Sequence, residues 1–303
     1  MDSYVPAFAD VQVLTGFDGD TPVLRAPASR ATVRQLLTHT AGLGYWFWSE
    51  DLKKFEEVTG VPNVVPGSAE AFKAPMLTDP GVRFNYGINT DWLGRVVEAI
   101  GGAGLDVLIA DGVTGPLGMA DTMFRLDPDR TANCVTVHVK GADGGWVSAG
   151  EILNQEPDWW AGGHGLYSTP RDYIRFERAL LRGGELDGVR ILAPETVDAA
   201  FTNQIGELDV PSVIPTADPP ISDTIEFGPG FKWGFGLLLN TTDIPGGRRA
   251  GTGAWAGLFN THFFIDRTSG VCASIYTNSL PFASRQEAWQ TYADVEAALY
   301  ASR

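Results

Sequence analysis

The chain has 303 residues, of which 44% are hydrophobic and 19% are charged, and its formal net charge is −15. This composition is that of an ordinary folded protein, so it excludes a disordered chain. The acidity argues against nucleic acid and anionic membrane surfaces as partners, because both favour a basic face. A chain of this length is expected to form a single domain, residues 1–303, or two closely packed domains.

The two cysteines, Cys134 and Cys272, lie in apolar, strand-like runs, which favours buried thiols over a disulfide framework. No apolar run approaches the length of a membrane span, and the first residues lack the basic and apolar regions of a signal peptide. We therefore expect a cytoplasmic chain with no membrane partner. No pattern calls for a cofactor or a metal, because the histidines lack metal-ligand spacing and each is interpreted as structural: His39, His138, His164 and His262.

Residues 1–30 are predicted to be extended and rich in turns, one of them at Asp18-Gly19. Thr32 is expected to cap a short helix over 33–38, and Ser49 a second helix to about residue 58 with Gly60 behind it. Between them lie four consecutive aromatic residues, Tyr45-Trp46-Phe47-Trp48. These rings cannot all face one core, so at least one is expected to line a cleft.

Tyr86 is predicted to lie on a short loop that enters a buried helix. Asn89 or Thr90 can cap this helix, Gly101-Gly102 can end it, and its apolar face would comprise Trp92, Leu93, Val96, Val97 and Ile100. Such a loop is a rigid mount for a side chain that points into a cleft. Taken alone, Tyr86 is better interpreted as a half-buried core aromatic. Together with a helix over 105–111, these elements make residues 31–130 mainly helical.

Residues 131–303 are predicted to form a sheet and end in a helix. Strands are expected at 134–140, 231–239, 258–266 and 271–277, the last two forming a hairpin. Thr169 or Ser168, with Pro170, opens a strong amphipathic helix to Leu181. Residues 202–230 are interpreted as a long surface loop that could serve as an active-site flap. The C-terminal helix follows the capping box Ser284-Arg285-Gln286-Glu287, with one face formed by Trp289, Tyr292, Val295 and Leu299.

Familiar hydrolase motifs are absent from this sequence. It has no Gly-x-Ser-x-Gly elbow, which disfavours an α/β-hydrolase, and no His-Glu-x-x-His. Four segments in a fixed order instead resemble the serine β-lactamase and penicillin-binding-protein superfamily. They are Leu36-Leu37-Thr38-His39-Thr40-Ala41-Gly42-Leu43, the stretch from Tyr86 to Gly94, Gly162-Gly163-His164-Gly165-Leu166-Tyr167-Ser168-Thr169 with Asp172-Tyr173, and Trp255-Ala256-Gly257-Leu258.

The segments are most similar to the esterase branch of the superfamily, that is, family VIII carboxylesterases and lovastatin-type acyltransferases. The tail Leu280-Pro281-Phe282-Ala283-Ser284 also resembles that branch. The resemblance implies an α/β (α+β) fold of the β-lactamase/transpeptidase type, in which an antiparallel sheet is flanked by helices and joined by a mainly helical region. Ile88 and Ala256 depart from the motifs of the superfamily, and Ile88 weakens any expectation of efficient β-lactam hydrolysis.

The more serious departure is that the family's nucleophile motif, Ser-x-x-Lys, does not occur in the sequence. We therefore expect an N-terminally shortened domain that lacks the first strands and the central nucleophile helix. Such a domain would leave an apolar groove open, with self-association as one way of covering it.

By this resemblance, Tyr86 is the catalytic proton carrier, supported by the family's lysine, and the backbone N–H of Leu258 is one oxyanion donor. The strand motif Trp255-Ala256-Gly257-Leu258 would supply that donor. The substrate pocket would be shaped by aromatic rings, for which core packing is the competing interpretation: Trp46, Trp48, Trp159 and Trp160.

The function predicted is hydrolysis of a small-molecule carboxylic ester, or an amide, through an acyl-enzyme, impaired in this chain by the missing motif. Acyl transfer to an alcohol is the alternative within the same branch. A non-catalytic binding protein or remnant is a second class, and a D-Ala-D-Ala carboxypeptidase is a less favoured third.

Overall fold

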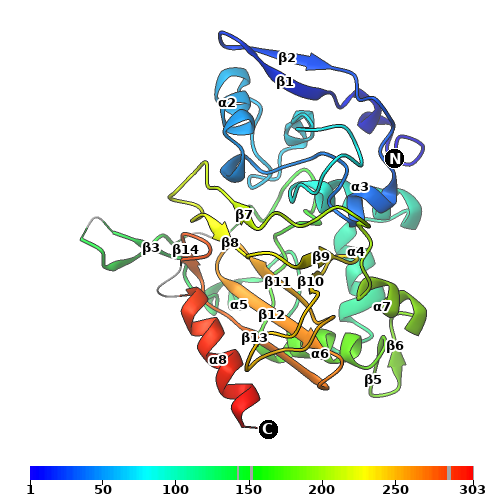
Figure 1. Ribbon diagram of the computed structural model, residues 1–303, viewed down its shortest axis with the longest axis vertical. Helices are drawn as coiled ribbons and strands as arrows, with labels where there is room; N and C mark the ends of the chain where they lie inside the picture. The colour runs from blue at the N-terminus through cyan, green and yellow to red at the C-terminus, as the bar shows by residue number, and fades with distance from the viewer. Residues whose placement is uncertain (142, 151–152, 285–287, 303) are drawn as a thin grey trace. The chain divides into compact units, whose positions relative to one another are not determined.

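The computed structural model describes residues 1–141, 143–150, 153–284 and 288–302 (Figure 1). The chain divides into two compact units. The first comprises Met1–Asp111 and Leu153–Leu166, and the second comprises Gly112–Ile152 and Tyr167–Arg303. The single domain expected over residues 1–303 stays a prediction.

The first unit is mainly helical, with one hairpin near its start. Its elements are η1 Pro6–Asp10, β1 Val13–Asp18, β2 Thr21–Arg25, α1 Val33–Leu37, η2 Trp46–Trp48, α2 Glu50–Thr59, η3 Ala69–Lys73, α3 Asn89–Gly101 and α4 Leu105–Ile109. Strands β1 and β2 pair antiparallel around the predicted turn at Asp18-Gly19. The extended entry expected for residues 1–30 is therefore a β-hairpin.

Side-chain caps begin helices α1 and α2 where the sequence predicts them. Thr32 and Gln35 form a capping box on α1, and the Ser49 hydroxyl accepts a hydrogen bond from the Leu52 N–H at the start of α2. Gly60 and Gly102 end α2 and α3 in the left-handed conformation, which glycine adopts without steric cost.

Helix α3 differs from the prediction at its start and on its buried face. Its N-cap is Ile88, with no side-chain cap, because Asn89 is turned inward. The residues of α3 that are buried are Asn89, Asp91, Trp92, Gly94 and Val96, whereas Ile100 is 67% exposed. The predicted apolar face was wrong at Val97 and Ile100, because the hydrophobic period does not show that polar Asn89 and Asp91 occupy the inward positions.

The second unit is built on a five-stranded antiparallel sheet of order β13-β12-β11-β10-β9. Its elements are α5 Pro128–Ala132, β3 His138–Lys140, β4 Trp146–Ser148, α6 Pro170–Leu181, β5 Glu185–Leu186, β6 Val189–Arg190, α7 Pro194–Ala200, β7 Val213–Ile214, β8 Ile225–Glu226, β9 Phe231–Trp233, β10 Leu238–Asn240, β11 Gly253–Gly257, β12 Thr261–Asp266, β13 Val271–Ile275, β14 Ser279–Leu280 and α8 Gln290–Ala301; the π-helical η4 Ala110–Thr114 leads into it.

Helices cover both faces of this sheet. Phe264 packs with Tyr292 of α8, whereas its neighbour Ile265 packs with Leu180 of α6 and Val197 of α7. Adjacent strand residues point to opposite faces, so β12 places one apolar residue in each layer. The antiparallel sheet flanked by helices is thereby confirmed.

All four predicted strands have different bounds in the structure. The strand predicted at 271–277 ends at Ile275. The strand predicted at 231–239 is two strands, β9 and β10, because Gly236 adopts a φ of +75° and a side chain at Gly234 would meet the Ala200 carbonyl. The strand at 134–140 begins only at His138. The strand at 258–266 begins at Thr261, since the residues before it form a turn. Within the predicted loop 202–230, β7 and β8 pair antiparallel.

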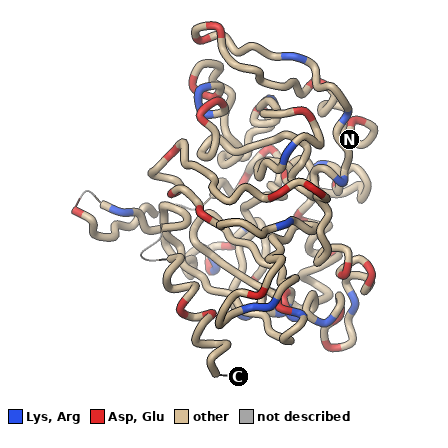
Figure 2. The backbone as a smooth tube through the Cα atoms, viewed as in Figure 1, with Lys and Arg blue, Asp and Glu red and all other residues tan. Residues whose placement is uncertain are grey.

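A buried ion pair attaches α8 to the sheet, whereas most other charged pairs are exposed. Figure 2 shows acidic and basic residues interspersed along the chain, and exposed charged pairs contribute little to stability. Arg248 is the exception: its Nε lies 3.4 Å from Glu296 Oε1, and its Nη1 donates to the Tyr292 hydroxyl at 2.7 Å. The capping box predicted for this helix includes residues 285–287, which lie outside the described residues.

A buried acid on α6 makes the stability of the second unit depend on pH. Glu177 is fully buried in the core under β13. Burial raises its pKa from 4.5 to about 7, and the neighbouring Ser274 hydroxyl offsets part of that rise. The folded protein therefore keeps this proton in a pH range where the unfolded chain has already lost it. The resulting stabilisation is full below about pH 4.5 and declines until about pH 7.

We expect Glu177→Gln to remove this dependence. The variant should gain stability over the unchanged protein as pH rises from 5 to 8, by at most about 3 kcal/mol, measured by urea unfolding at both pH values. Glu207→Gln, at an exposed position, is the matched control. Parallel stability curves for the Glu177 variant and the unchanged protein would show that the carboxyl is ionised in the folded state.

Candidate functional site

Tyr86 is held by a close approach of two backbones in the first unit. Phe84 is buried on one side of it, and α3 begins on the other side at Asn89. A side chain at Gly87 would lie 2.3 Å from the carbonyl carbon of Gly44 and 2.4 Å from its Cα. Because neither residue has a side chain, the segment that follows α1 and the Tyr86 loop meet directly. The loop therefore has little freedom to shift.

His39 packs against the Tyr86 ring, with ring centroids 4.2 Å apart and planes at 32°. It follows α1 in a Schellman motif, in which the His39 N–H bonds to the Leu36 carbonyl and the Thr40 N–H to the Gln35 carbonyl. Its φ is +52°, a left-handed conformation that usually selects glycine. Burial lowers the pKa of the His39 imidazole from 6.5 to about 3, so the ring is neutral at ordinary pH.

The side chain of Asn89 joins the three segments that surround this contact. Its Nδ2 donates to the Leu43 carbonyl at 3.2 Å and to the Asn85 carbonyl at 3.1 Å, and it lies 3.1 Å from His39 Nδ1. Asn89 is fully buried. These bonds connect the end of α1, the residues after it and the Tyr86 loop through one uncharged group.

Aromatic rings frame Tyr86 on its other sides. The centroid of Tyr45 lies 5.8 Å away and that of Trp48 5.9 Å away. Burial raises the pKa of the Tyr45 hydroxyl, and repulsion from Asp91 and Tyr86 in their ionised forms raises it further. A second phenol that stays protonated therefore lies beside Tyr86.

The glycines of the segment 162–169 pack against the first turn of α3. A side chain at Gly162 would meet the Thr90 carbonyl at 2.2 Å, and one at Gly163 would meet the Tyr45 hydroxyl at 2.8 Å. The Gly163 N–H donates to Asp91 Oδ1 at 2.9 Å. Burial raises the pKa of Asp91, although His164 and the Gly163 N–H act in the opposite direction. The glycine motif thus has a structural role: it seats the helix that follows Tyr86.

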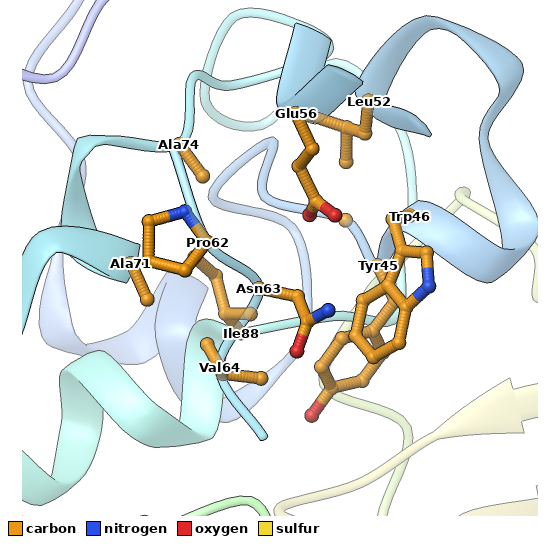
Figure 3. Close-up of a pocket in the computed structure, with 11 residues that line it drawn as sticks. Tyr45, Trp46, Leu52, Glu56, Pro62, Asn63, Val64, Ala71, Ala74 and Ile88 are labelled. Atoms are coloured by element: carbon orange, nitrogen blue, oxygen red, sulfur yellow. The ribbon is translucent and has the colours of Figure 1, made fainter. Parts of the chain in front are cut away.

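A small pocket lies between the aromatic segment and the residues before α3 (Figure 3). Tyr45 and Trp46 form one side of it, and Pro62, Val64 and Ile88 are among the residues on the other. Its free volume of about 10 Å³ accommodates about one water molecule. An acyl chain therefore does not fit in this pocket as the structure has it.

Of the tryptophans predicted to line the substrate pocket, one is buried in the core and three are half-buried. Trp159 is buried and packs on Phe72, with ring centroids 4.5 Å apart. Its position agrees with the competing interpretation of core packing. Trp46, Trp48 and Trp160 are only half-buried, so a substrate can still reach part of each ring.

In the second unit, Trp255, Ala256 and Gly257 end strand β11, and Leu258 lies in the turn that follows. The prediction that Leu258 begins a strand was wrong, because the Asn260 N–H returns to the Gly257 carbonyl at 2.9 Å and closes the turn. Among the described residues, the Leu258 N–H has no hydrogen-bond acceptor.

Asn260 fixes that turn to the tail segment. It adopts a φ of +62°, and its Nδ2 donates to the Ser279 and Pro281 carbonyls, both at 2.9 Å. Its Oδ1 accepts from the Ala283 N–H at 2.8 Å. The tail also bonds to the loop 202–230, since the Asp223 N–H donates to the Phe282 carbonyl. The tail motif noted in the sequence thus supports the turn after β11.

The Trp255 side chain packs within the second unit. Its ring meets buried Trp233 edge to face at 4.6 Å, and Phe227 lies 6.3 Å away. The C-terminal part of the loop 202–230 therefore reaches this strand.

Tyr86 and the four tryptophans of the predicted pocket belong to the first unit, whereas the strand motif belongs to the second. Sequence reasoning missed the parts played by His39, Asn89 and Asn260. The signals available were a histidine directly after a helix and asparagines next to glycine-rich turns, and neither signal distinguishes a buried anchor from an ordinary cap.

Comparison with known proteins identifies the family of this chain. The family model described as Beta-lactamase matches residues 4–297. The chain belongs to the beta-lactamase family. It is 31% identical over 284 residues to the lovastatin esterase of Penicillium rubens, which covers 90% of this chain and 70% of the esterase. It is 28% identical over 302 residues to the monacolin J acid methylbutanoyltransferase of Aspergillus terreus, covering 93% and 70% of the two chains.

Solved structures agree with this assignment. The beta-lactamase-family chain superposes on a mutant simvastatin synthase (LovD) from Aspergillus terreus with a TM-score of 0.82 at 26% identity, covering 99% of this chain and 75% of that one. EstCE1, a hydrolase with promiscuous acyltransferase activity, gives a TM-score of 0.70 at 20% identity over 99% and 76% of the two chains, which shows a shared fold. The relatives thus include both esterases and acyltransferases. Within the described residues, no helix is long and apolar enough to cross a membrane.

We expect Gly87→Ala to disrupt the Tyr86 loop, because the added methyl would lie 2.3 to 2.6 Å from backbone atoms of Gly44. Relief requires the backbone to move, so the free energy of unfolding should fall by about 1 to 3 kcal/mol. Gly112→Ala is the control, since a side chain there meets nothing within 4 Å. Urea unfolding compares the two, and equal stabilities would refute the close contact.

Proposed function

We propose that this beta-lactamase-family chain serves the cleavage of carboxylic esters through an acyl-enzyme, with Tyr86 as its proton carrier. The observation that carries the proposal is the immobilised phenol. Tyr86 rests on the Gly44–Gly87 contact and on the His39 ring. The 31% identity to a lovastatin esterase supports ester chemistry in particular.

The proposed reaction moves one proton twice. A serine hydroxyl attacks the ester carbonyl while its proton passes to the Tyr86 oxygen, and the same proton then goes to the departing alcohol. A phenol has an ordinary pKa near 10, so it accepts a proton at neutral pH only beside a positive charge. In the proposed site the lysine of a Ser-x-x-Lys motif provides that charge. This motif is absent from the 303 residues, so a segment joined to this chain would have to supply it.

The proposed oxyanion donor is the Leu258 N–H. It has no acceptor among the described residues, and the turn that carries it is fixed by Asn260. A preorganised donor is worth more than a mobile one, because it needs no reorganisation when negative charge develops. The half-buried rings of Trp46, Trp48 and Trp160 are proposed to contact the substrate.

Acyl transfer is the second candidate, because the relatives include a transferase as well as an esterase. The 28% identical relative from Aspergillus terreus is named as a methylbutanoyltransferase. In this reaction an alcohol replaces water as the acceptor of the acyl group. A soluble alcohol added to the assay separates the two: transfer yields the new ester, whereas hydrolysis yields only the acid.

The Tyr86 role can be tested with a fusion. The chain is joined at its N-terminus to a segment that carries a Ser-x-x-Lys motif, and p-nitrophenyl ester cleavage is followed. We expect the fusion to cleave the ester and Tyr86→Phe to lower kcat by about 10²- to 10⁴-fold, because the proton loses its carrier.

Two controls accompany this measurement. The chain without the fused segment should show only background cleavage. Tyr45→Phe removes a neighbouring phenol that is not assigned to proton transfer, so it should retain most of the activity. Equal rates for Tyr86→Phe and the parent fusion would remove Tyr86 from the mechanism.

The oxyanion role can be tested by deleting one N–H. Proline suits the second position of a turn and lacks the donor, so Leu258→Pro should fold while the fusion loses about 10²- to 10³-fold in kcat. Leu258→Ala shortens the side chain and keeps the N–H, so its kcat should stay near that of the parent. If both variants lose activity equally, the side chain and not the donor is what matters.

A further inference from the structure

The hydrogen bonds around Asn89 determine which nitrogen of His39 carries the proton. The Asn89 amide is oriented by two carbonyls, Leu43 and Asn85, which only its NH₂ group can satisfy. The same nitrogen lies 3.1 Å from His39 Nδ1, and the Gly87 N–H points at Nδ1 from 3.4 Å. The two carbonyls take both hydrogens of the Asn89 NH₂ group, so the Gly87 N–H is the donor to Nδ1. A proton on Nδ1 would point at this N–H and at the NH₂ group, neither of which can accept it. Nδ1 is therefore an acceptor, and the proton of the neutral ring is on Nε2.

The backbone of His39 is the second observation. The left-handed position after a helix costs a residue other than glycine about 1 to 2 kcal/mol, and His39 occupies it with a φ of +52°. This conformation directs a fully buried ring under Tyr86, with the two centroids 4.2 Å apart. A glycine would form the same Schellman motif more easily, but it would place nothing under the phenol.

We propose that His39 is a positioning residue for Tyr86, whose neutral imidazole, held in the Nε2–H tautomer by Asn89 and Gly87, fixes the orientation of the phenol ring. The reason for positioning Tyr86 rests on the proposed function. The contact between the two rings and the tautomer can be measured without ester cleavage. Burial holds the pKa of His39 at about 3, so the ring adds no positive charge beside the phenol through the neutral pH range.

The groups that face His39 support this arrangement. Phe84 lies 5.9 Å from its ring, between centroids, and adds no charge. The amide of Asn89 and the backbone of Gly87 are uncharged as well. Tyr86 is the titratable group whose ring packs against it.

The test uses the purified 303-residue chain with ¹⁵N-labelled histidine and ¹³C-labelled tyrosine. In ¹⁵N NMR spectra, His39 should show an unprotonated Nδ1 and a protonated Nε2, unchanged between pH 5 and 8. The His39 signals are assigned by elimination, as those that remain when His138, His164 and His262 are each replaced by Gln, and those of Tyr86 by their loss in Tyr86→Phe. A His39 signal that titrates in this range, or an Nδ1 that carries the proton, would overturn the proposal.

Two variants separate stacking from hydrogen bonding. His39→Asn suits the left-handed backbone but removes the ring, so the Tyr86 ring signals should lose their ring-current shift. His39→Phe keeps a ring and removes the Nδ1 acceptor, so part of that shift should remain while the Gly87 amide exchanges faster with solvent. Unchanged Tyr86 signals in a folded His39→Asn variant would contradict the positioning role, even if its melting temperature falls.

The outcomes also distinguish this inference from the proposed function. If neither variant folds, the tautomer in the unchanged chain decides the question. If Tyr86→Phe leaves ester cleavage by the fusion unaltered while the tautomer and ring shifts are as expected, the proposed function fails and the positioning of Tyr86 by His39 stands.

Discussion

The approach of the Gly44 and Gly87 backbones is the constraint on which the first unit depends. Two chain segments that lie far apart in sequence touch without side chains between them, at distances that exclude even a methyl group. The contact brings the two segments close enough for the Asn89 amide to reach both of them. Its Nδ2 donates to the Leu43 carbonyl in one segment and to the Asn85 carbonyl in the other, and it lies near His39 Nδ1. Tyr86 is adjacent to Gly87, so the same contact that closes the core also limits where the phenol can point.

The second unit also has a loop that is fixed by a buried asparagine. Asn260 fixes the turn after β11 through three backbone partners in the tail segment, as Asn89 fixes the loop before α3. Both side chains are buried and uncharged. A buried amide with its bonds made loses less solvation energy than a charged side chain and adds no field to its surroundings. Each of these amides holds its loop without adding a charge to it.

The sequence was most informative where structure is decided locally. Thr32, Ser49 and Thr169 cap helices as predicted, since a cap depends on residues three positions away. Sequence reasoning failed where contacts between residues far apart in the chain determine the structure. Nothing near Asn89 shows that its amide reaches residues 46 and 50 positions earlier in the chain. Likewise, the run 231–239 has strand-like composition, and only the contact of Gly234 with Ala200 explains why it folds back on itself. Tyr86 was found through the order of motifs, not through its own surroundings.

The surroundings of Tyr86 also constrain any mechanism in which it moves a proton. Its neighbours His39 and Tyr45 are a neutral imidazole and a phenol whose pKa is raised, so neither stabilises a phenolate. Asp91, which is buried, would oppose the ionisation of Tyr45 if it carried its charge. These residues hold the Tyr86 ring in place. In the proposed mechanism the positive charge that a phenolate needs would therefore come from the lysine of a Ser-x-x-Lys motif and not from these two neighbours.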